Sequence, residues 1–418
     1  MTRTPLFLQS MIAASLALAS ISAQAADKPV TAQEIAIGSK QYGPAQQSQG
    51  GLYTLDPELQ AYVTRVGTKL TRVSVFPDLP YSFVVLNNSE LNAWALPGGK
   101  IAVNRGLLAE LDNEAQLAAV LAHEISHVTK RHSARMQKKA GGAGLLGALV
   151  GLGVGAKVPE YRELAMRGAN AVAFAGQANY SRDHEIQADN EGIKLMAAAG
   201  YDPRAAADVQ RIFLEKAQNR KSNALEALFA SHPPSQERVD NNAGRAAKYP
   251  EGGMIGAAEY ARATARLQKD KPAYALLAQA MTAYGEKKFD TSIAFCDKAI
   301  ALQPKETLFW ELKGITLLQQ KQYTKSISAL NQAVTLNSGF YRPLLYRGLA
   351  YKEQGTLDKA QSSLSASNAL LPTQLATYHL GEIAQSQGDR ETAIKHFTAV
   401  ANAGGELGEA AKRQLRTL

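Results

Sequence analysis

The sequence contains a single cysteine, Cys296, in 418 residues, so an intramolecular disulfide is excluded in any compartment. It also lacks the clustered basic and aromatic residues that are typical of nucleic-acid-binding proteins. The formal net charge is +9, but the 46 Lys and Arg residues are spread along the chain. We therefore expect no nucleic-acid partner. A hydrophobic fraction of 45% is ordinary for a globular protein, and the length predicts two or three domains.

The N-terminal segment has the pattern of a secretory signal peptide. Arg3 provides a positive charge, residues 6–21 are apolar, and Ala23-Gln24-Ala25 is a small-x-small cleavage site. The apolar run is short for a membrane-spanning helix, and no cysteine follows the cleavage site, which excludes attachment as a lipoprotein. We expect a signal peptide at 1–25, cleavage after Ala25 and export. A bacterial-style signal on a chain without disulfides favours the periplasm.

One motif carries metal chemistry: residues 123–127 read H-E-x-x-H. Apolar residues around the motif recur at steps of three and four, which predicts a helix with one buried face, from a cap at 112–113 to about Lys139. Residues four apart share a helical face, so His123 and His127 can direct two imidazoles at one Zn²⁺. Glu124 lies beside them, where it can act as general base on the water that attacks a peptide carbonyl.

A helix over 57–73 and three short strands, over 81–86, 91–96 and 100–103, are predicted before this motif. The fold class that we expect is mainly α with a small β-sheet. An exposed edge strand could hold a peptide substrate extended beside the metal, whereas a plain hairpin packed on the helices is the alternative. The residues of the candidate substrate-binding edge strand are Asn92, Ala93 and Trp94.

Two histidines cannot close a tetrahedral metal site, so a further ligand is required. His132 lies five residues after His127, on another face, and we expect it at the surface or supporting a ligand rather than binding the metal. Glu185 and Asp189 are four apart on a later predicted helix. One carboxylate can bind the metal while the other orients a ligating histidine. An acidic pair on a solvated face is the alternative, and His184 is a rival ligand that points away from that face.

Two further stretches each have more than one interpretation. His232, in a proline-rich loop, could steady an oxyanion, as could Arg238. His232 could instead occupy the fourth metal position and keep the enzyme latent, or have no role. Residues 140–156 hold no charge and seven glycines and follow a basic stretch. They are too few to span a membrane, so a packing segment or lid and a peripheral contact with an anionic membrane surface are the two alternatives.

The last third of the chain repeats with a period of about 34 residues, as Phe289, Tyr323 and Leu357 show. Small residues recur at fixed points, which is the pattern of tetratricopeptide helix pairs. We expect four units, over 273–306, 307–340, 341–373 and 374–407, with Cys296 in the core of the first. Stacked units form a concave surface that binds protein segments. The predicted domains are a metallopeptidase domain at 26–245, a linker or bridging helix at 246–272, and a repeat domain at 273–418.

Three motifs, in order, resemble the HtpX-like gluzincin peptidases over about residues 30–245: the run 92–99, the helix 117–127 and the Glu185-x-x-Ala188-Asp189 segment. Trp94 departs from the Phe that is more usual there. The resemblance implies that His123, His127 and Glu185 bind zinc. It further implies that Glu124 is the general base and Asp189 a catalytic or supporting acid. For His232, it favours the role that blocks the metal.

With its signal peptide and repeats, the whole mature chain resembles the BepA-type family of periplasmic β-barrel assembly-enhancing proteases. This resemblance implies a zinc metalloendopeptidase that degrades misfolded or stalled outer-membrane proteins and assists β-barrel assembly. Its partners would be those unfolded substrates and, through the repeats, the β-barrel assembly machinery. The alternative function is a non-proteolytic periplasmic chaperone or adaptor that works through the repeat array and has a structural zinc site.

Overall fold

The computed structural model describes residues 29–139, 180–218 and 232–418. The expected signal peptide and the glycine-rich stretch 140–156 lie outside these ranges. Within them, none of the helices combines the length and the apolar character that crossing a membrane requires.

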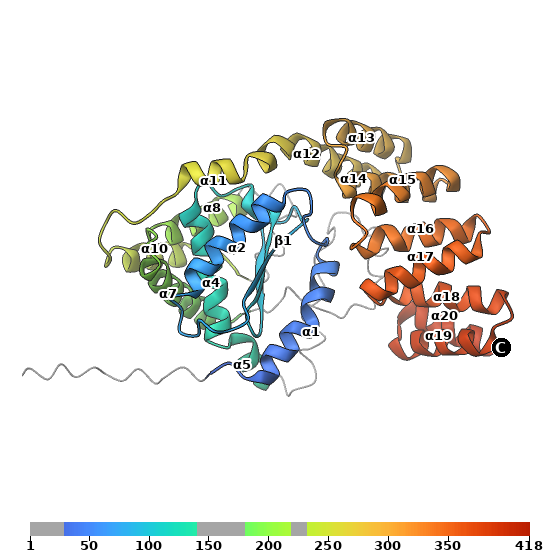
Figure 1. Ribbon diagram of the computed structural model, residues 1–418, viewed down its shortest axis with the longest axis horizontal. Coiled ribbons are helices and arrows are strands. Elements are labelled where there is room, and N and C mark those ends of the chain that lie inside the picture. The colour runs from blue at the N-terminus through green and yellow to red at the C-terminus, as the bar shows by residue number, and fades with distance from the viewer. Residues whose placement is uncertain (1–28, 140–179, 219–231) are drawn as a thin grey trace, which may run out of the picture.

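The first half of the chain is a helical unit built on a small sheet (Figure 1). Helices α1 (Ala32–Ser48) and α2 (Pro57–Thr71) precede strands β1 (Ser82–Leu86), β2 (Ala93–Leu96) and β3 (Lys100–Asn104), and a short helix α3 (Arg105–Leu108) follows. The strand order is β1-β3-β2, with β1 parallel and β2 antiparallel to β3. Strand β2 therefore lies at an edge of the sheet, as the interpretation of residues 91–96 as a substrate-binding strand requires.

The H-E-x-x-H motif lies on helix α4 (Glu114–Thr129), which is buried along most of its length. Asn113 caps this helix by accepting a hydrogen bond from the backbone N–H of Gln116, as its sequence predicts. The prediction that one helix continues to about Lys139 is wrong. Arg131 adopts a left-handed backbone with φ of 55°, which ends α4 and starts a separate helix, α5 (His132–Lys139). The side chain of Arg131 is held by an ion pair with Glu34 of α1.

The second acidic motif lies on α7 (Arg182–Ala198), which packs closely along α4. Gly192 makes this approach possible, because a Cβ atom there would lie 3.3 Å from the backbone nitrogen of His123. Helix α7 ends before Gly200, whose φ is 81°, as expected for a glycine that terminates a helix. Helices α8 (Ala205–Gln218) and α10 (Gln236–Ala246) pack against each other and flank the same site.

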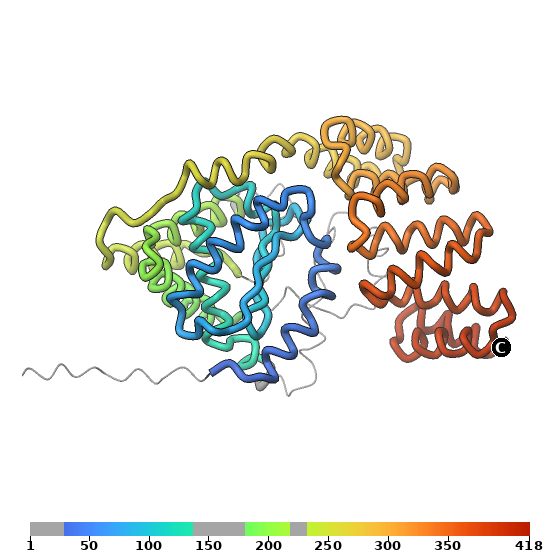
Figure 2. The backbone as a smooth tube through the Cα atoms, in the orientation of Figure 1, coloured from blue at the N-terminus to red at the C-terminus, as the bar shows by residue number. Residues whose placement is uncertain are grey.

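The second half of the described chain is a stack of antiparallel helix pairs that extends to one side of the first half (Figures 1 and 2). The repeats predicted from the 34-residue period are present as four pairs with one further helix after them. In chain order they are α12 (Ala265–Gly285), α13 (Phe289–Leu302), α14 (Thr307–Gln319), α15 (Tyr323–Leu336), α16 (Tyr341–Glu353), α17 (Leu357–Leu370), α18 (Gln374–Ser386), α19 (Arg390–Ala403) and α20 (Gly405–Leu415).

The periodic small residues bring the two helices of a pair together. A Cβ atom on Gly314 would lie 2.5 Å from Leu330 Cγ on the facing helix, and Ser326 Oγ donates a hydrogen bond to the carbonyl oxygen of Gly314. Cys296 is fully buried in the core of the first pair, as its position in the repeat predicts.

The connection between the two halves is helical. Helix α11 (Ala257–Ala263) docks on the first half through Tyr260, whose hydroxyl donates to the carbonyl oxygen of Leu108. Leu267 of α12 belongs to the same hydrophobic core as α2 and α4. Helix α12 then continues into the first repeat without a break, so the boundary expected at 272 falls inside one helix.

A buried polar network joins the two halves at a second place. Glu306, which begins α14, accepts hydrogen bonds from Asn87 Nδ2 at 2.8 Å and from the Tyr274 hydroxyl at 2.6 Å. Arg105 Nε donates to Asn87 Oδ1 at 2.7 Å, and its guanidinium carbon lies 3.3 Å from the centre of the Tyr274 ring. The loop after β1 and the start of α3 are thereby bonded to the repeat array.

Candidate metal centre

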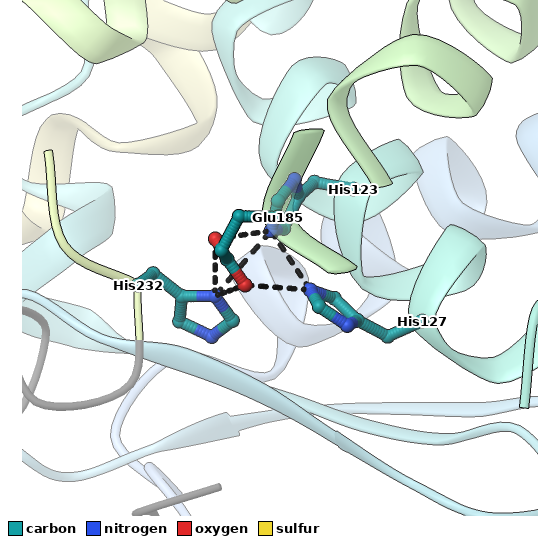
Figure 3. A group of neighbouring side chains, drawn as sticks. All are labelled: His123, His127, Glu185 and His232. Carbon is teal, nitrogen blue, oxygen red and sulfur yellow. Dashed lines mark hydrogen bonds and ion pairs between the residues drawn. The ribbon is translucent and has the colours of Figure 1, made fainter. Parts of the chain in front are cut away.

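Four side chains from three parts of the chain converge between α4, α7 and the segment before α10: His123, His127, Glu185 and His232 (Figure 3). One candidate ligand atom from each lies within 4.8 Å of all the others. His123 Nε2 is 2.9 Å from His127 Nε2, and the Glu185 carboxylate lies 3.4 and 3.3 Å from these two atoms. His232 Nδ1 is 3.1 Å from Glu185 Oε1 and 3.3 Å from His123 Nε2.

These separations fit a tetrahedral cation. With metal–ligand bonds of about 2.0–2.1 Å, neighbouring ligands of a tetrahedral zinc ion lie about 3.3 Å apart. Five of the six distances between candidate ligand atoms lie from 2.9 to 3.4 Å, near that value, and the sixth, between His127 and His232, is within 4.8 Å. Nitrogen and carboxylate donors in this number are also the set that zinc prefers.

The charges of the site favour a cation as well. Glu124, Glu185 and Asp189 are 2%, 1% and 6% exposed, and Arg238, also buried, is the cation paired with them. Three carboxylates against one guanidinium leave an excess of negative charge in a buried place, which is costly unless a further positive charge, from a metal ion or a protonated histidine, is present. A divalent ion provides that charge.

The pKa values of the site reflect the same excess of buried negative charge. Burial lowers the pKa of His123, but Glu185 and Asp189 outweigh burial and raise that pKa to about 10. Burial acts to raise the pKa of Glu185, yet His232 and His123 hold it well below its ordinary value. Burial raises the pKa of Glu124 above its ordinary value despite the neighbouring histidines. A positive charge is therefore stabilised between the carboxylates.

Asp189 contacts the ring nitrogen of His123 that faces away from the candidate metal position, and Arg238 holds Asp189. Asp189 Oδ1 lies 2.9 Å from His123 Nδ1, which places the ring proton on Nδ1 and turns the lone pair of Nε2 toward the candidate metal position. Arg238 binds both oxygens of Asp189 through Nε and Nη2, each at 2.8 Å, while its Nη1 contacts Glu185 at 3.0 Å and the carbonyl oxygen of Pro233 at 3.2 Å. The donors of Arg238 thus hold α7 and the His232 segment together, so the geometry favours this tether over a contact with an oxyanion.

His127 is supported by His132, which is one of the two positions that the sequence left open for this residue, whereas the alternative position at the surface is wrong. His132 is completely buried, and its Nδ1 lies 2.9 Å from His127 Nδ1, while its Nε2 lies 2.9 Å from Gln187 Oε1. Arg135 Nη1 also donates to Gln187 Oε1, at 3.2 Å, so this oxygen is an acceptor and His132 must donate to it through Nε2. His132 Nδ1 then accepts from His127 Nδ1–H. The lone pair of His127 is left on Nε2, which faces Glu185.

We expect His132→Leu to weaken zinc binding about 10- to 100-fold, the usual cost of losing a group that orients a metal ligand. His132→Asn, whose amide oxygen can accept the His127 proton, should recover part of this loss. Zinc affinity would be measured by competition with a chromophoric chelator, with circular dichroism as the control for folding. Equal affinities in the Leu and Asn variants would show that His132 acts through packing alone.

The remaining predicted site residues lie as follows. Glu124 is near the cluster without belonging to it: its Oε1 is 3.5 Å from His232 Nε2, and no donor in the described ranges reaches its Oε2. His184 is outside the cluster and stacks on His132, with ring centres 4.4 Å apart. Tyr180, which the sequence did not suggest, stacks on His127 with ring centres 3.9 Å apart. It could have been noticed only as an aromatic residue just before the acidic motif.

The edge strand β2 runs beside the site. Ala93 lines the same pocket as His123 and Glu124. Asn92 is buried at the start of the strand, and the side chain of Trp94 packs inward with Leu86 and Leu96. The strand therefore offers its main chain rather than these side chains.

The site combines an H-E-x-x-H helix, a glutamate from a second helix that lies against the two histidines, and a further buried carboxylate. This combination defines a metallopeptidase. Comparison with known proteins agrees. Residues 57–246 match peptidase family M48, and residues 309–340 match the tetratricopeptide repeat. Residues 57–246 therefore form a metallopeptidase domain that is similar to family M48, and helix pairs similar to tetratricopeptide repeats follow it.

Three relatives illustrate the similarity. The beta-barrel assembly-enhancing protease of Escherichia coli (strain K12) is 29% identical over 343 residues, which cover 74% of this chain and 68% of that protein. The putative beta-barrel assembly-enhancing protease of Vibrio cholerae serotype O1 is 31% identical over 287 residues, covering 67% and 56%. The mitochondrial metalloendopeptidase OMA1 of Schizosaccharomyces pombe is 34% identical over 180 residues, covering 43% and 50%.

Proposed function

We propose that this protein is a zinc endopeptidase that holds one zinc ion through His123, His127 and Glu185. The convergence of these three side chains at tetrahedral ligand spacing is the observation that supports the proposal. Zinc, when bound, polarises a carbonyl group and lowers the pKa of water to about 7. The test is metal analysis together with casein cleavage by the wild type and by a Glu124→Gln variant.

Glu124 acts as the general base in this proposal. It follows His123 directly on α4, is almost fully buried, and has an oxygen that no described donor occupies. Its pKa, raised by burial, brings the carboxylate closer to the range in which it can accept a proton and return it to the leaving amine. Asp189 orients His123, because both of its oxygens are already bonded to Arg238.

The substrate lies extended along the free edge of β2. Ala93 of β2 lines the pocket beside the site, and within the described ranges β2 is an edge strand, whose unpaired N–H and C=O groups can bind a peptide as an added strand. Main-chain binding of this kind accepts many sequences, which suits an enzyme that removes unfolded proteins.

We further propose that the substrates are misfolded or stalled outer-membrane β-barrel proteins. The names of the Escherichia coli and Vibrio cholerae relatives support this assignment. Export by the predicted signal peptide would place the enzyme in the periplasm, where such proteins pass. The repeats, whose stacked pairs form a surface suited to protein segments, would contact the β-barrel assembly machinery.

His232 would hold the enzyme latent by taking the fourth ligand position. Its Nδ1 lies 3.1 and 3.2 Å from the two oxygens of Glu185 and 3.3 Å from His123 Nε2. We expect His232→Ala to raise basal casein cleavage, by roughly tenfold if about a tenth of the wild-type molecules are open at any time. His396→Ala, on α19 of the repeat array, is the matched control. Unchanged or lost cleavage in the His232 variant would favour an oxyanion role or none.

The same four-residue cluster supports a second candidate function. A zinc ion enclosed permanently by four protein ligands is structural, and the protein would then be a chaperone or adaptor that works through its repeats. The Glu124→Gln variant separates the two functions, because a chaperone would keep its activity after this substitution and a peptidase would not.

A further inference from the structure

A largely apolar pocket opens directly beside the proposed catalytic residues. It lies between α4, α7 and α8 and has His123 and Glu124 at its wall. Ala93 of the edge strand also lines it, so a peptide held along β2 would pass its mouth. The apolar lining residues are Leu107, Val120, Ile193, Met196, Val209 and Phe213.

Besides the ionisable residues of the metal centre, two amide side chains line this pocket, and each has an unused acceptor. Gln210 and Asn242 line the pocket and are only 6% and 1% exposed. No donor in the described part of the chain reaches Gln210 Oε1 or Asn242 Oδ1. A buried amide oxygen without a partner costs free energy, so each oxygen favours a ligand that brings a hydrogen-bond donor.

We propose that this pocket binds an aromatic side chain with a donor at its tip, tyrosine or tryptophan, from the substrate residue next to the scissile bond. The inference rests on the proposed peptidase function. An aromatic ring buries the large apolar area that these walls offer, and its O–H or N–H can satisfy the amide oxygens. A carboxylate fits poorly because it would face two acceptor oxygens as well as Glu124 and Asp189, which also line the pocket.

This preference suits the proposed substrates. Outer-membrane β-barrels carry girdles of aromatic residues at both membrane interfaces. These residues are accessible in an unassembled chain and covered by lipid in a finished barrel. A peptidase that selects them next to the cleaved bond would therefore distinguish unassembled from assembled barrels by residue type.

The test uses four peptides that differ only in one residue flanking the cleaved bond: Tyr, Phe, Leu or Ala. We expect kcat/KM to be highest for Tyr, and about 2- to 12-fold above Phe, because a hydrogen bond contributes about 0.5–1.5 kcal/mol. Gln210→Leu with Asn242→Leu should bring the Tyr/Phe ratio to about one while the Phe peptide is still cleaved. Asn190→Leu, an amide on α7 outside this pocket, is the control and should keep the ratio.

A binding experiment keeps the test independent of catalysis. N-acetyltyrosinamide and N-acetylphenylalaninamide are compared by saturation-transfer NMR on the Glu124→Gln protein, and we expect the tyrosine compound to bind more tightly. Cleavage without an aromatic preference would overturn the pocket assignment and leave the peptidase intact. Preferential tyrosine binding, lost in the double variant, combined with no cleavage by the wild type would support the pocket and count against the peptidase. Absence of both would overturn both.

Discussion

Replacing Glu124 with glutamine is expected to lower the rate of casein cleavage by about a hundred- to ten-thousand-fold, the usual contribution of a general base. The amide has nearly the same shape as the carboxylate but cannot accept a proton. Glu124 lies outside the four-residue ligand cluster, so zinc content should be unchanged at one ion per chain. Loss of cleavage without loss of metal is the result that the peptidase function requires.

The measurement combines zinc analysis of the purified protein with a fluorescent-casein assay. Glu191→Gln is the matched control, because Glu191 lies on α7 outside the ligand cluster and pairs with Lys194 and Lys130. That variant should retain both metal and activity. Should casein still be cleaved at the wild-type rate by the Glu124 variant, Glu124 would not be the base and the repeat-based chaperone function would gain support.

Replacing Glu185 with alanine should have the largest effect on the metal itself. Glu185 contributes the only carboxylate of the four-residue cluster and lies 3.3–3.4 Å from both ligand nitrogens of α4. We expect zinc affinity to fall by more than about 100-fold, beyond the loss expected for a residue that only orients a ligand. Arg238 keeps its two contacts with Asp189, so the α7 helix should remain in place.

This loss can be followed through thermal stability. A ligand that binds only the folded protein at 100 times its dissociation constant stabilises it by about 2.7 kcal/mol. Added zinc should therefore raise the Tm of the wild type and of Glu191→Ala, and leave the Tm of Glu185→Ala unchanged. An equal zinc-dependent shift in all three proteins would show that Glu185 is not a ligand.

Local patterns predicted much of this fold. The helical period around residues 117–128 and the cap at 112–113 are properties of short segments, and the structure has both. The 34-residue repeat likewise predicted the helix pairs, because each unit buries the same small residues against its neighbour. The prediction that Glu185 lies with the two histidines rested on the spacing within each helix and on the family resemblance. In the structure these three side chains lie together.

The rest depends on contacts between segments distant in sequence. The break at Arg131 arises where that side chain binds Glu34, nearly a hundred residues earlier, and helical periodicity cannot show it. Only after this break can His132 turn back onto His127, which is why its completely buried position could not be derived. The two hydrogen bonds from Arg238 to Asp189 join α10 to α7. These residues are 49 apart in sequence, so no local pattern could predict the contact.

The network around Glu306 has a consequence for how the molecule can be divided. Cutting the chain near residue 272 would strand Asn87 and Arg105 on one fragment and Glu306 on the other. Separating the fragments would break these hydrogen bonds, each of which contributes about 0.5–1.5 kcal/mol, and would expose their polar groups to water. The peptidase domain and the repeats are thus joined by buried polar contacts as well as by a helix, so a substrate bound to the repeats, as proposed, would lie at a set distance from Glu124.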